Sequence, residues 1–138
     1  MKNVLTLTLA ATLMATLTGC ESSQTATSST AKETKTYKVA VVKQLDHASL
    51  DEIAKAICDE FDAISEKEGV KIEYDDVYSG QNDQTVLQQI ASQVTSEGVD
   101  AIVPVATLAA QTMTVASDGT VPVVFAAISD PEAADLTG

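Results

Sequence analysis

The sequence predicts an α/β fold, a doubly wound parallel sheet with helices on both faces. Short runs rich in β-branched residues alternate with longer segments in which apolar residues recur at helical spacing. Strands that alternate with helices of this length form βαβ units and therefore run parallel. Because such crossovers are right-handed, we expect the four predicted strands to lie in the order 2-1-3-4.

The first predicted strand covers residues 37–43, and a helix follows it. Ser49 and Glu52 have the spacing of a capping box, which predicts Ser49 as the N-cap of this helix. Gly69 stands where a left-handed cap usually ends a helix. Apolar residues at helical spacing predict one buried face between these points. They are Leu50, Ile53, Ala54, Ile57, Phe61 and Ile64.

The second strand is predicted at residues 70–74, where apolar and polar residues alternate. A turn at residues 79–82 leads into the second helix, and Gly98 closes that helix. The second helix carries its own apolar stripe, which predicts its buried face. The residues of this stripe are Val86, Leu87, Ile90, Ala91 and Val94.

Residues 99–103 are predicted to form the third strand, and Thr107 to cap a third helix that runs to about Ala116. The pair Asp118-Gly119 makes the turn that follows. Residues 121–127 are nearly all apolar, which predicts a fourth strand covered on both faces.

Residues 1–19 have the features of a bacterial export signal. Lys2 supplies a positive start, and residues 4–18 carry no charge. The uncharged stretch is shorter than the ~20 apolar residues of a membrane span, so it is interpreted as a signal-peptide core. It ends in Leu17-Thr18-Gly19-Cys20, which resembles the lipobox of bacterial lipoproteins. The resemblance implies that Cys20 is acylated with fatty acids such as palmitate and anchors the protein to the extracytoplasmic face of the membrane.

Residues 20–36 are predicted to form a lipidated, flexible tether ahead of the folded region at residues 37–138. In residues 21–36 alanine is the only apolar residue, so the segment cannot bury enough surface to offset its chain entropy. As a random coil it reaches roughly 20–25 Å, which lets the folded part move above the bilayer.

Composition and side-chain chemistry exclude several classes of function. The chain has 20 acidic and 8 basic residues, and a net charge of −12 argues against nucleic acid as a partner. With one histidine and no C-x-x-C motif, it offers no metal-ligand spacing. Cys58 is interpreted either as a small buried hydrophobic residue or as a reactive thiol. No glycine-rich loop follows the first strand and no catalytic triad can be assembled, so we expect neither a cofactor nor an enzyme.

A ligand site is predicted where three loops follow strands. In open parallel sheets, ligands bind outside the carboxyl ends of the strands where the strand order reverses. The loops are at residues 44–49, 106–109 and 129–131. Helix N-termini in the first two suit a carboxylate, and Asp130 in the third can accept hydrogen bonds from an ammonium group. Together these groups suit a zwitterion such as an amino acid.

Each residue in these loops also has a structural interpretation. Asp46 can start a turn, and His47 can be a solvated or helix-capping residue. Thr107 can cap its helix and still bind a ligand, because both roles belong to a helix N-terminus. Asp130-Pro131 makes a turn with or without a ligand.

Four sequence blocks, in this order, resemble the solute-binding proteins of the tryptophan/tyrosine ABC importer family. The resemblance extends over residues 37–138. The blocks are Asp46-His47-Ala48-Ser49-Leu50-Asp51, Gln81-Asn82-Asp83, Ala106-Thr107-Leu108-Ala109-Ala110-Gln111 and Val123-Val124-Phe125-Ala126-Ala127-Ile128-Ser129-Asp130-Pro131. Ala48 and Leu108 stand where the family commonly has proline. These differences loosen both loops and leave the identity of the ligand open.

The resemblance implies a two-lobed protein that closes on a small solute and delivers it to an ABC permease. Because relatives are longer, we expect this chain to be the first lobe only, a truncated piece that lacks half the cleft. The alternative is a surface or signalling lipoprotein that senses a small ligand without transport. The implied ligand is an aromatic amino acid. Its contacts would be Asp46, His47, Thr107, Leu108, Ser129 and Asp130.

Overall fold

The computed structural model describes residues 34–137. The predicted signal peptide, Cys20 and most of the predicted tether lie outside these residues. None of the helices in the described part is long and apolar enough to cross a membrane.

The described sheet has four strands, β1 (Thr36–Lys43), β2 (Lys71–Tyr74), β3 (Tyr78–Ser79) and β4 (Ala101–Val105). All four pair in parallel, with β1 at the centre. Val39 of β1 pairs with Tyr74 and with Ala101, which lie on opposite sides of it. Val42 likewise pairs with Tyr78 of β3 on one side and with Pro104 of β4 on the other. Strands β2 and β3 therefore share one edge of β1, and β4 lies along the other edge.

The predicted strand order is confirmed, although the predicted fourth strand is reduced to two isolated bridges. Val123 pairs in parallel with Ile102, and Ala126 with Val105. The Val124 N–H donates to the Ile102 carbonyl at 2.9 Å. This segment therefore lies beside β4 and gives the order β2-β1-β4-(123–126), which is the predicted 2-1-3-4. Strand β3 was not predicted, and its second residue, Ser79, was assigned to the turn at residues 79–82. Strand β4 begins two residues later than predicted.

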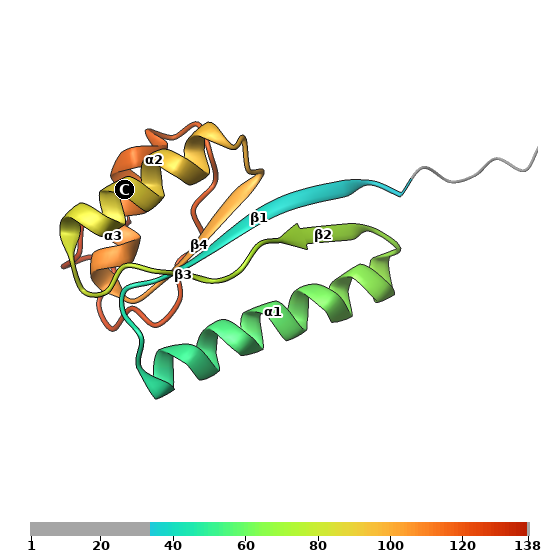
Figure 1. Cartoon of the computed structure of the whole chain (residues 1–138), viewed down its shortest axis with the longest axis horizontal. Coiled ribbons are helices and arrows are strands. Elements are labelled where there is room, and N and C mark those ends of the chain that lie inside the picture. The colour runs from blue at the N-terminus through green and yellow to red at the C-terminus, as the bar shows by residue number, and fades with distance from the viewer. Residues whose placement is uncertain (1–33, 138) are drawn as a thin grey trace, which may run out of the picture. The chain divides into compact units, whose positions relative to one another are not determined.

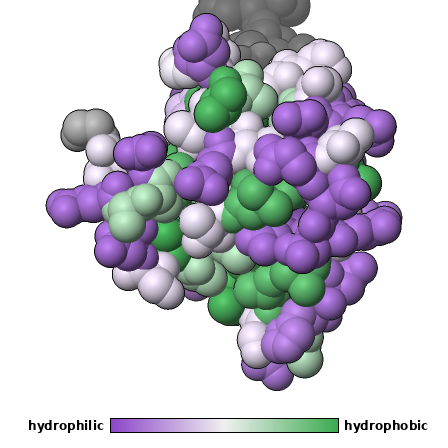
Figure 2. All heavy atoms as spheres, turned by 90° about the vertical axis from the view of Figure 1, so that its left-hand side faces the viewer, coloured by the Kyte–Doolittle hydropathy of each residue, from purple (hydrophilic) through white to green (hydrophobic). Residues whose placement is uncertain are grey.

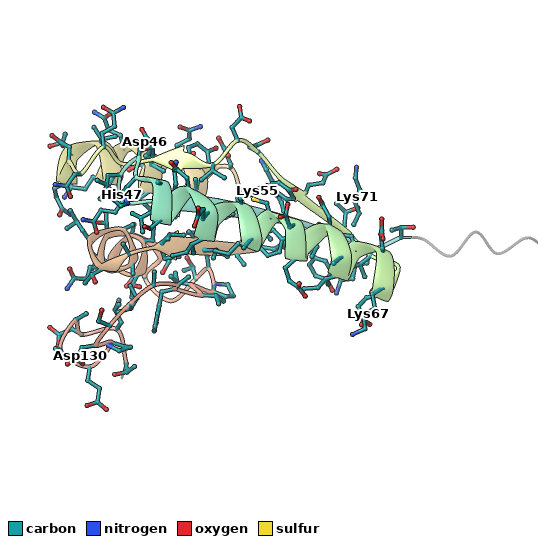
Figure 3. The ribbon with its side chains drawn as sticks, turned by 90° about the horizontal axis from the view of Figure 1, so that it is seen from below. Asp46, His47, Lys55, Lys67, Lys71 and Asp130 are labelled. Atoms are coloured by element: carbon teal, nitrogen blue, oxygen red, sulfur yellow. The ribbon has the colours of Figure 1, made fainter. Side chains whose placement is uncertain are left out.

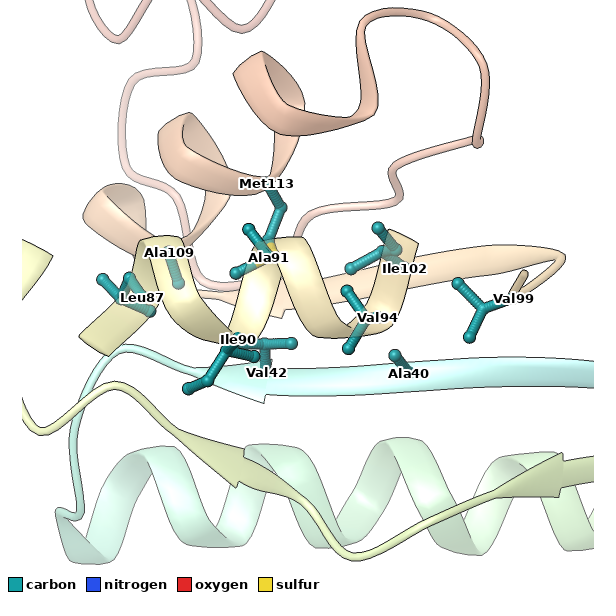
Figure 4. Close-up of a cluster of buried hydrophobic side chains, with 10 residues drawn as sticks. All are labelled: Ala40, Val42, Leu87, Ile90, Ala91, Val94, Val99, Ile102, Ala109 and Met113. Carbon is teal, nitrogen blue, oxygen red and sulfur yellow. The ribbon is translucent and has the colours of Figure 1, made fainter. Parts of the chain in front are cut away.

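Helices cover both faces of the sheet (Figure 1). Helix α1 (Ala48–Glu68) lies on one face, and α2 (Gln84–Ser96) and α3 (Thr107–Ser117) lie on the other. Each face has its own apolar core. Figure 4 shows the core under α2 and α3, where Leu87, Val94 and Met113 are fully buried. The doubly wound fold class is therefore confirmed.

The prediction that residues 121–127 are covered on both faces is wrong. Val124 is 61% exposed, and Pro122 and Ala127 are exposed as well. The physical reason is position: this segment is the outermost strand-like element of the described sheet. Helix α1 lies to one side of it, and an apolar groove of about 450 Å³ separates Ile53, Ile57 and Phe61 from residues 124–126.

The start of α1 differs from the predicted capping box. The N-cap is His47, whose Nδ1 accepts a hydrogen bond from the Ser49 N–H at 3.3 Å. Ser49 already lies inside the helix, because the extended backbone of His47 (φ −155°, ψ 136°) brings its ring nitrogen over the first turn. At the other end, Gly69 adopts the predicted left-handed conformation with φ 65°.

The second helix confirms its predicted apolar face, but the predicted cap of the third helix is wrong. Four of the five stripe residues of α2 are buried, and the helix is capped by the Asp83 carboxylate. Thr107 is the first residue of α3 rather than its cap. The N-cap position belongs to Ala106, whose methyl group cannot accept a hydrogen bond. The turn predicted at Asp118 and Gly119 is confirmed, because both have positive φ.

Candidate functional site

The loops after β1 and β4 meet at the carboxyl edge of the sheet, and Gln44 joins them. Its backbone N–H donates to the Val105 carbonyl at 3.1 Å. Its side-chain Oε1 accepts from the Leu108 N–H at 3.0 Å, and its Nε2 donates to Asn82 Oδ1 at 2.8 Å. The turn before α2 therefore joins the two predicted loops at this edge. Gln44 was part of the first predicted loop, but nothing in the sequence indicated its partners.

The backbone between β4 and α3 is strained. Ala106 has φ 78° and ψ 161°, a region that is essentially restricted to glycine. The Ala106 N–H donates to the Ala126 carbonyl at 3.0 Å, which ties this conformation to the edge of the sheet. Such strain costs about 1–3 kcal/mol and clusters at ligand-binding loops. It supports the assignment of this loop as functional.

A lysine with two carboxylate partners lies at the start of the first loop. The Lys43 ammonium contacts Asp46 at 2.9 Å and also pairs with Asp51, and its side chain is only 12% exposed. The hydrogen bond to Asp51, and to a lesser degree the one to Asp46, raises the pKa of Lys43. Lys43 lowers the pKa of Asp46. One positive charge facing two negative charges leaves this corner net negative, which suits a ligand ammonium group.

Ser79 brings an unpaired polar atom to the same corner. Its Oγ is buried and has no hydrogen-bond partner among the described residues. The hydroxyl lies near the Asp46 carboxylate, but the two groups do not meet the geometry of a hydrogen bond. Because a buried unpaired hydroxyl is costly, this atom needs a water molecule or a ligand group as a partner.

The predicted residues of the first two loops are close to each other in the fold. Asp46 and His47 are exposed at the N-terminus of α1, as Figure 3 shows for both side chains. Thr107 is also exposed, and Leu108 is half-buried. His47 has the helix-capping role that was one of its two interpretations. Ligand contact by these residues stays a prediction.

The third loop does not join the other two as predicted. Asp130 lies well apart from Asp46 and His47 in Figure 3. Its Oδ1 accepts from the Ala133 N–H at 3.0 Å, so Asp130 caps a turn at the end of the described chain. That turn is held by α3, because Gln111 Nε2 donates to the Ala134 carbonyl at 3.1 Å. Ser129 and Asp130 are exposed, and no described element covers them.

The carboxyl edge forms one wall rather than an enclosed pocket. Of the six predicted site residues, five are exposed. Leu108 lines a cavity of about 340 Å³ between α2 and α3, where Gln84 Nε2 donates to Thr112 Oγ1 at 3.0 Å. Figure 2 faces this end of the molecule and shows apolar side chains among hydrophilic ones. Such a mixed surface suits a small amphipathic ligand.

Residues 34–137 contain no group of three His, Cys, Asp or Glu side chains that could hold a metal ion. The groups at the edge are amides, hydroxyls, one lysine, one histidine and carboxylates. They bind and orient polar atoms by hydrogen bonds and charge.

Comparison with known proteins identifies a family and solved structures that are similar to this chain. A family model described as ABC transporter substrate binding protein matches residues 38–138. A solved structure of a conserved domain protein from Vibrio cholerae is 34% identical, with a TM-score of 0.66 over 75% of this chain and 34% of that one. No curated protein matches the chain.

Two further solved structures are similar to this chain, one with a bound ligand and one without. An ABC domain from Streptococcus pneumoniae, solved in complex with L-Trp, is 34% identical, with a TM-score of 0.60 over 72% of this chain and 32% of that one. A substrate-binding protein with adhesive properties from Clostridium difficile, solved open and ligand-free, is 30% identical, with a TM-score of 0.57 over 73% of this chain and 34% of that one. The chain thus spans about a third of the length of these structures.

Proposed function

Because the chain belongs to the family of ABC transporter substrate-binding proteins, we propose that it binds an aromatic amino acid outside the cytoplasm for delivery to an ABC permease. One observation carries the choice of ligand. The Streptococcus pneumoniae relative, 34% identical to this chain, was solved with L-Trp. The net negative corner at Lys43, Asp46 and Asp51 supports a ligand that carries an ammonium group.

We infer that the folded part supplies one wall of a two-lobed binding cleft. The chain covers only about a third of each related structure, so the rest of such a protein would supply the opposing wall. The proposed contacts on this wall are Asp46, His47, Thr107, Leu108, Ser129 and Asp130.

The proposed anchor is the lipid on Cys20, with residues 1–19 removed as a signal peptide. The permease is the proposed protein partner. The family's members generally bind solutes without converting them, and we propose no reaction for this chain. Residues 20–36 would then serve as the tether between the membrane and the binding wall.

The test is a titration of the full chain with L-tryptophan and L-tyrosine, followed by NMR of the backbone amides. We expect binding of millimolar strength at best, about −4 kcal/mol, because one wall leaves the ligand in contact with solvent. The amides of the loops at 44–49 and 106–109 should shift. If neither amino acid shifts these amides at its solubility limit, the proposed function is wrong.

A matched pair of variants tests the role of Asp130. Asp130→Asn removes the charge, and Asp118→Asn removes another exposed charge, in the turn after α3. We expect only the first to weaken binding, by at most about 1 kcal/mol while the carboxylate is exposed. The loss should be about 2–4 kcal/mol in a protein with an enclosed cleft. Micromolar binding by the monomeric chain would contradict the one-wall proposal, and wild-type affinity in Asp130→Asn would remove Asp130 from the site.

A further inference from the structure

We propose that Gln44 is a positioning residue of the binding wall, one that holds the start of α3 and the turn before α2 in a single arrangement. This role rests on the proposed function, because the loop held by Gln44 carries the proposed contacts Thr107 and Leu108. Gln44 acts through its two hydrogen-bond partners.

The geometry of the Gln44 amide supports this role. Both ends of the amide are used: Oε1 accepts from the Leu108 N–H at 3.0 Å, and Nε2 donates to Asn82 Oδ1 at 2.8 Å. The Gln44 carbonyl also accepts from the Asn82 N–H at 2.8 Å. One half-buried residue thus joins two segments that are 38 and 64 positions away in the sequence.

Both segments need such support because their own conformations are unfavourable. Ala106 occupies a glycine-only backbone region and gives α3 no side-chain cap, so the Leu108 N–H depends on Gln44 for a partner. Gln81 and Asn82 are consecutive non-glycine residues with φ of 51° and 57°. A left-handed conformation costs a residue such as Gln81 roughly 1–2 kcal/mol, although asparagine tolerates it better, and it persists where neighbouring contacts enforce it. Gln44 bonds to Asn82 itself and to Leu108, two residues after Ala106.

The predicted consequence is local. Without the Gln44 amide, the first turn of α3 should fray and Ala106 should relax toward an ordinary conformation. The core beneath should remain, because Leu87 and Met113 pack through apolar contacts that Gln44 does not make. The proposed ligand contacts would then lose their fixed orientation while the domain stays folded.

The experiment compares Gln44→Met with Gln44→Glu in the full chain, with amide hydrogen exchange measured by NMR. Methionine keeps the length of the side chain and removes both hydrogen bonds. Glutamate keeps an acceptor for the Leu108 N–H and removes the donor to Asn82. Gln89→Met is the control, since Gln89 is an exposed glutamine on α2.

We expect Gln44→Met to speed exchange of the Leu108 amide by roughly 2- to 12-fold, the range for loss of one hydrogen bond, with core amides unchanged. Gln44→Glu should retain wild-type protection at Leu108, and Gln89→Met should change nothing there. Unchanged exchange at Leu108 in Gln44→Met, or an equal rise at every amide, would overturn the proposal. If the methionine variant does not fold, loss of Leu108 protection in Gln44→Glu overturns it and retention supports it.

A second measurement separates this proposal from the proposed function. L-tryptophan is added to each variant, and the shifts of the Thr107 and Leu108 amides are followed. We expect these shifts to shrink in Gln44→Met and to return in Gln44→Glu. If wild-type protein shows no shift with L-tryptophan, the proposed function fails, while the exchange result still decides whether Gln44 positions α3.

Discussion

Replacing Gly80 with alanine should destabilise the fold through a steric clash with the core. Gly80 is buried in the turn between β3 and α2. A Cβ at this position would lie 2.5 Å from Leu87 Cγ and 3.0 Å from the Gln44 carbonyl oxygen. Neither neighbour can move easily, because Leu87 is fully buried and the Gln44 oxygen belongs to the backbone.

The expected cost is about 3 kcal/mol, the upper part of the range for overpacking a core. The clash should also disturb the carboxyl edge, because the Gly80 N–H donates to the Lys43 carbonyl at 2.9 Å. Urea denaturation of wild type and Gly80→Ala measures the difference in the free energy of unfolding. Gly98→Ala serves as the control: its Cβ would meet open space, so only its left-handed φ of 67° contributes, about 1–2 kcal/mol.

A double mutant identifies the cause. Leu87→Ala alone should cost about 2–5 kcal/mol, and it also removes the atoms that the new methyl group would strike. Gly80→Ala together with Leu87→Ala should therefore cost about 1–3 kcal/mol less than the sum of the two single changes. Additive costs, or a cost below about 0.5 kcal/mol for Gly80→Ala alone, would refute the steric argument.

Three further predictions concern the anchor, the charges and the strain. Labelled fatty acid should appear on the chain and vanish in Cys20→Ala; unchanged labelling would exclude Cys20 as the lipidation site. Because Lys43 lowers the pKa of Asp46, this carboxylate should stabilise the fold above its unfolded-state pKa and lose that effect as pH falls through its folded-state pKa. In carbon NMR titrations, Lys43→Met should raise the pKa of Asp46, and an unmoved titration would contradict the pairing. Ala106→Gly should stabilise the chain by about 1 kcal/mol in urea denaturation because it releases the backbone strain, and a destabilised variant would contradict that strain.

Much of the fold could be predicted from local patterns. The apolar stripe of α2 gave the buried face correctly, since Leu87, Ile90, Ala91 and Val94 are all buried. Glycine at position 69 marked the end of α1, because few other residues tolerate a positive φ there. Right-handed crossovers then determined the strand order. These features depend on residues within a few positions of each other, so a single sequence contains them.

The caps and the coverage of the outer strand could not be predicted in this way. Ser49 and Thr107 are both residues that favour N-caps, yet His47 caps α1 and Gln44 supplies the acceptor at α3. The apolar composition of residues 121–127 indicated burial. Composition does not reveal whether another element of the described fold packs against each side of this segment.

The local patterns along the chain thus establish the elements, their order and the edge at which a ligand is expected. The arrangement of that edge was decided by tertiary contacts. Gln44 meets Asn82 and Leu108 across 38 and 64 residues, and Lys43 pairs with Asp51 across the loop that leads into the first turn of α1. Hydrophobic periodicity is repeated along each element and can be recognised from its neighbours in sequence. A single polar contact between distant segments has no period, and only the packed chain brings its two atoms together.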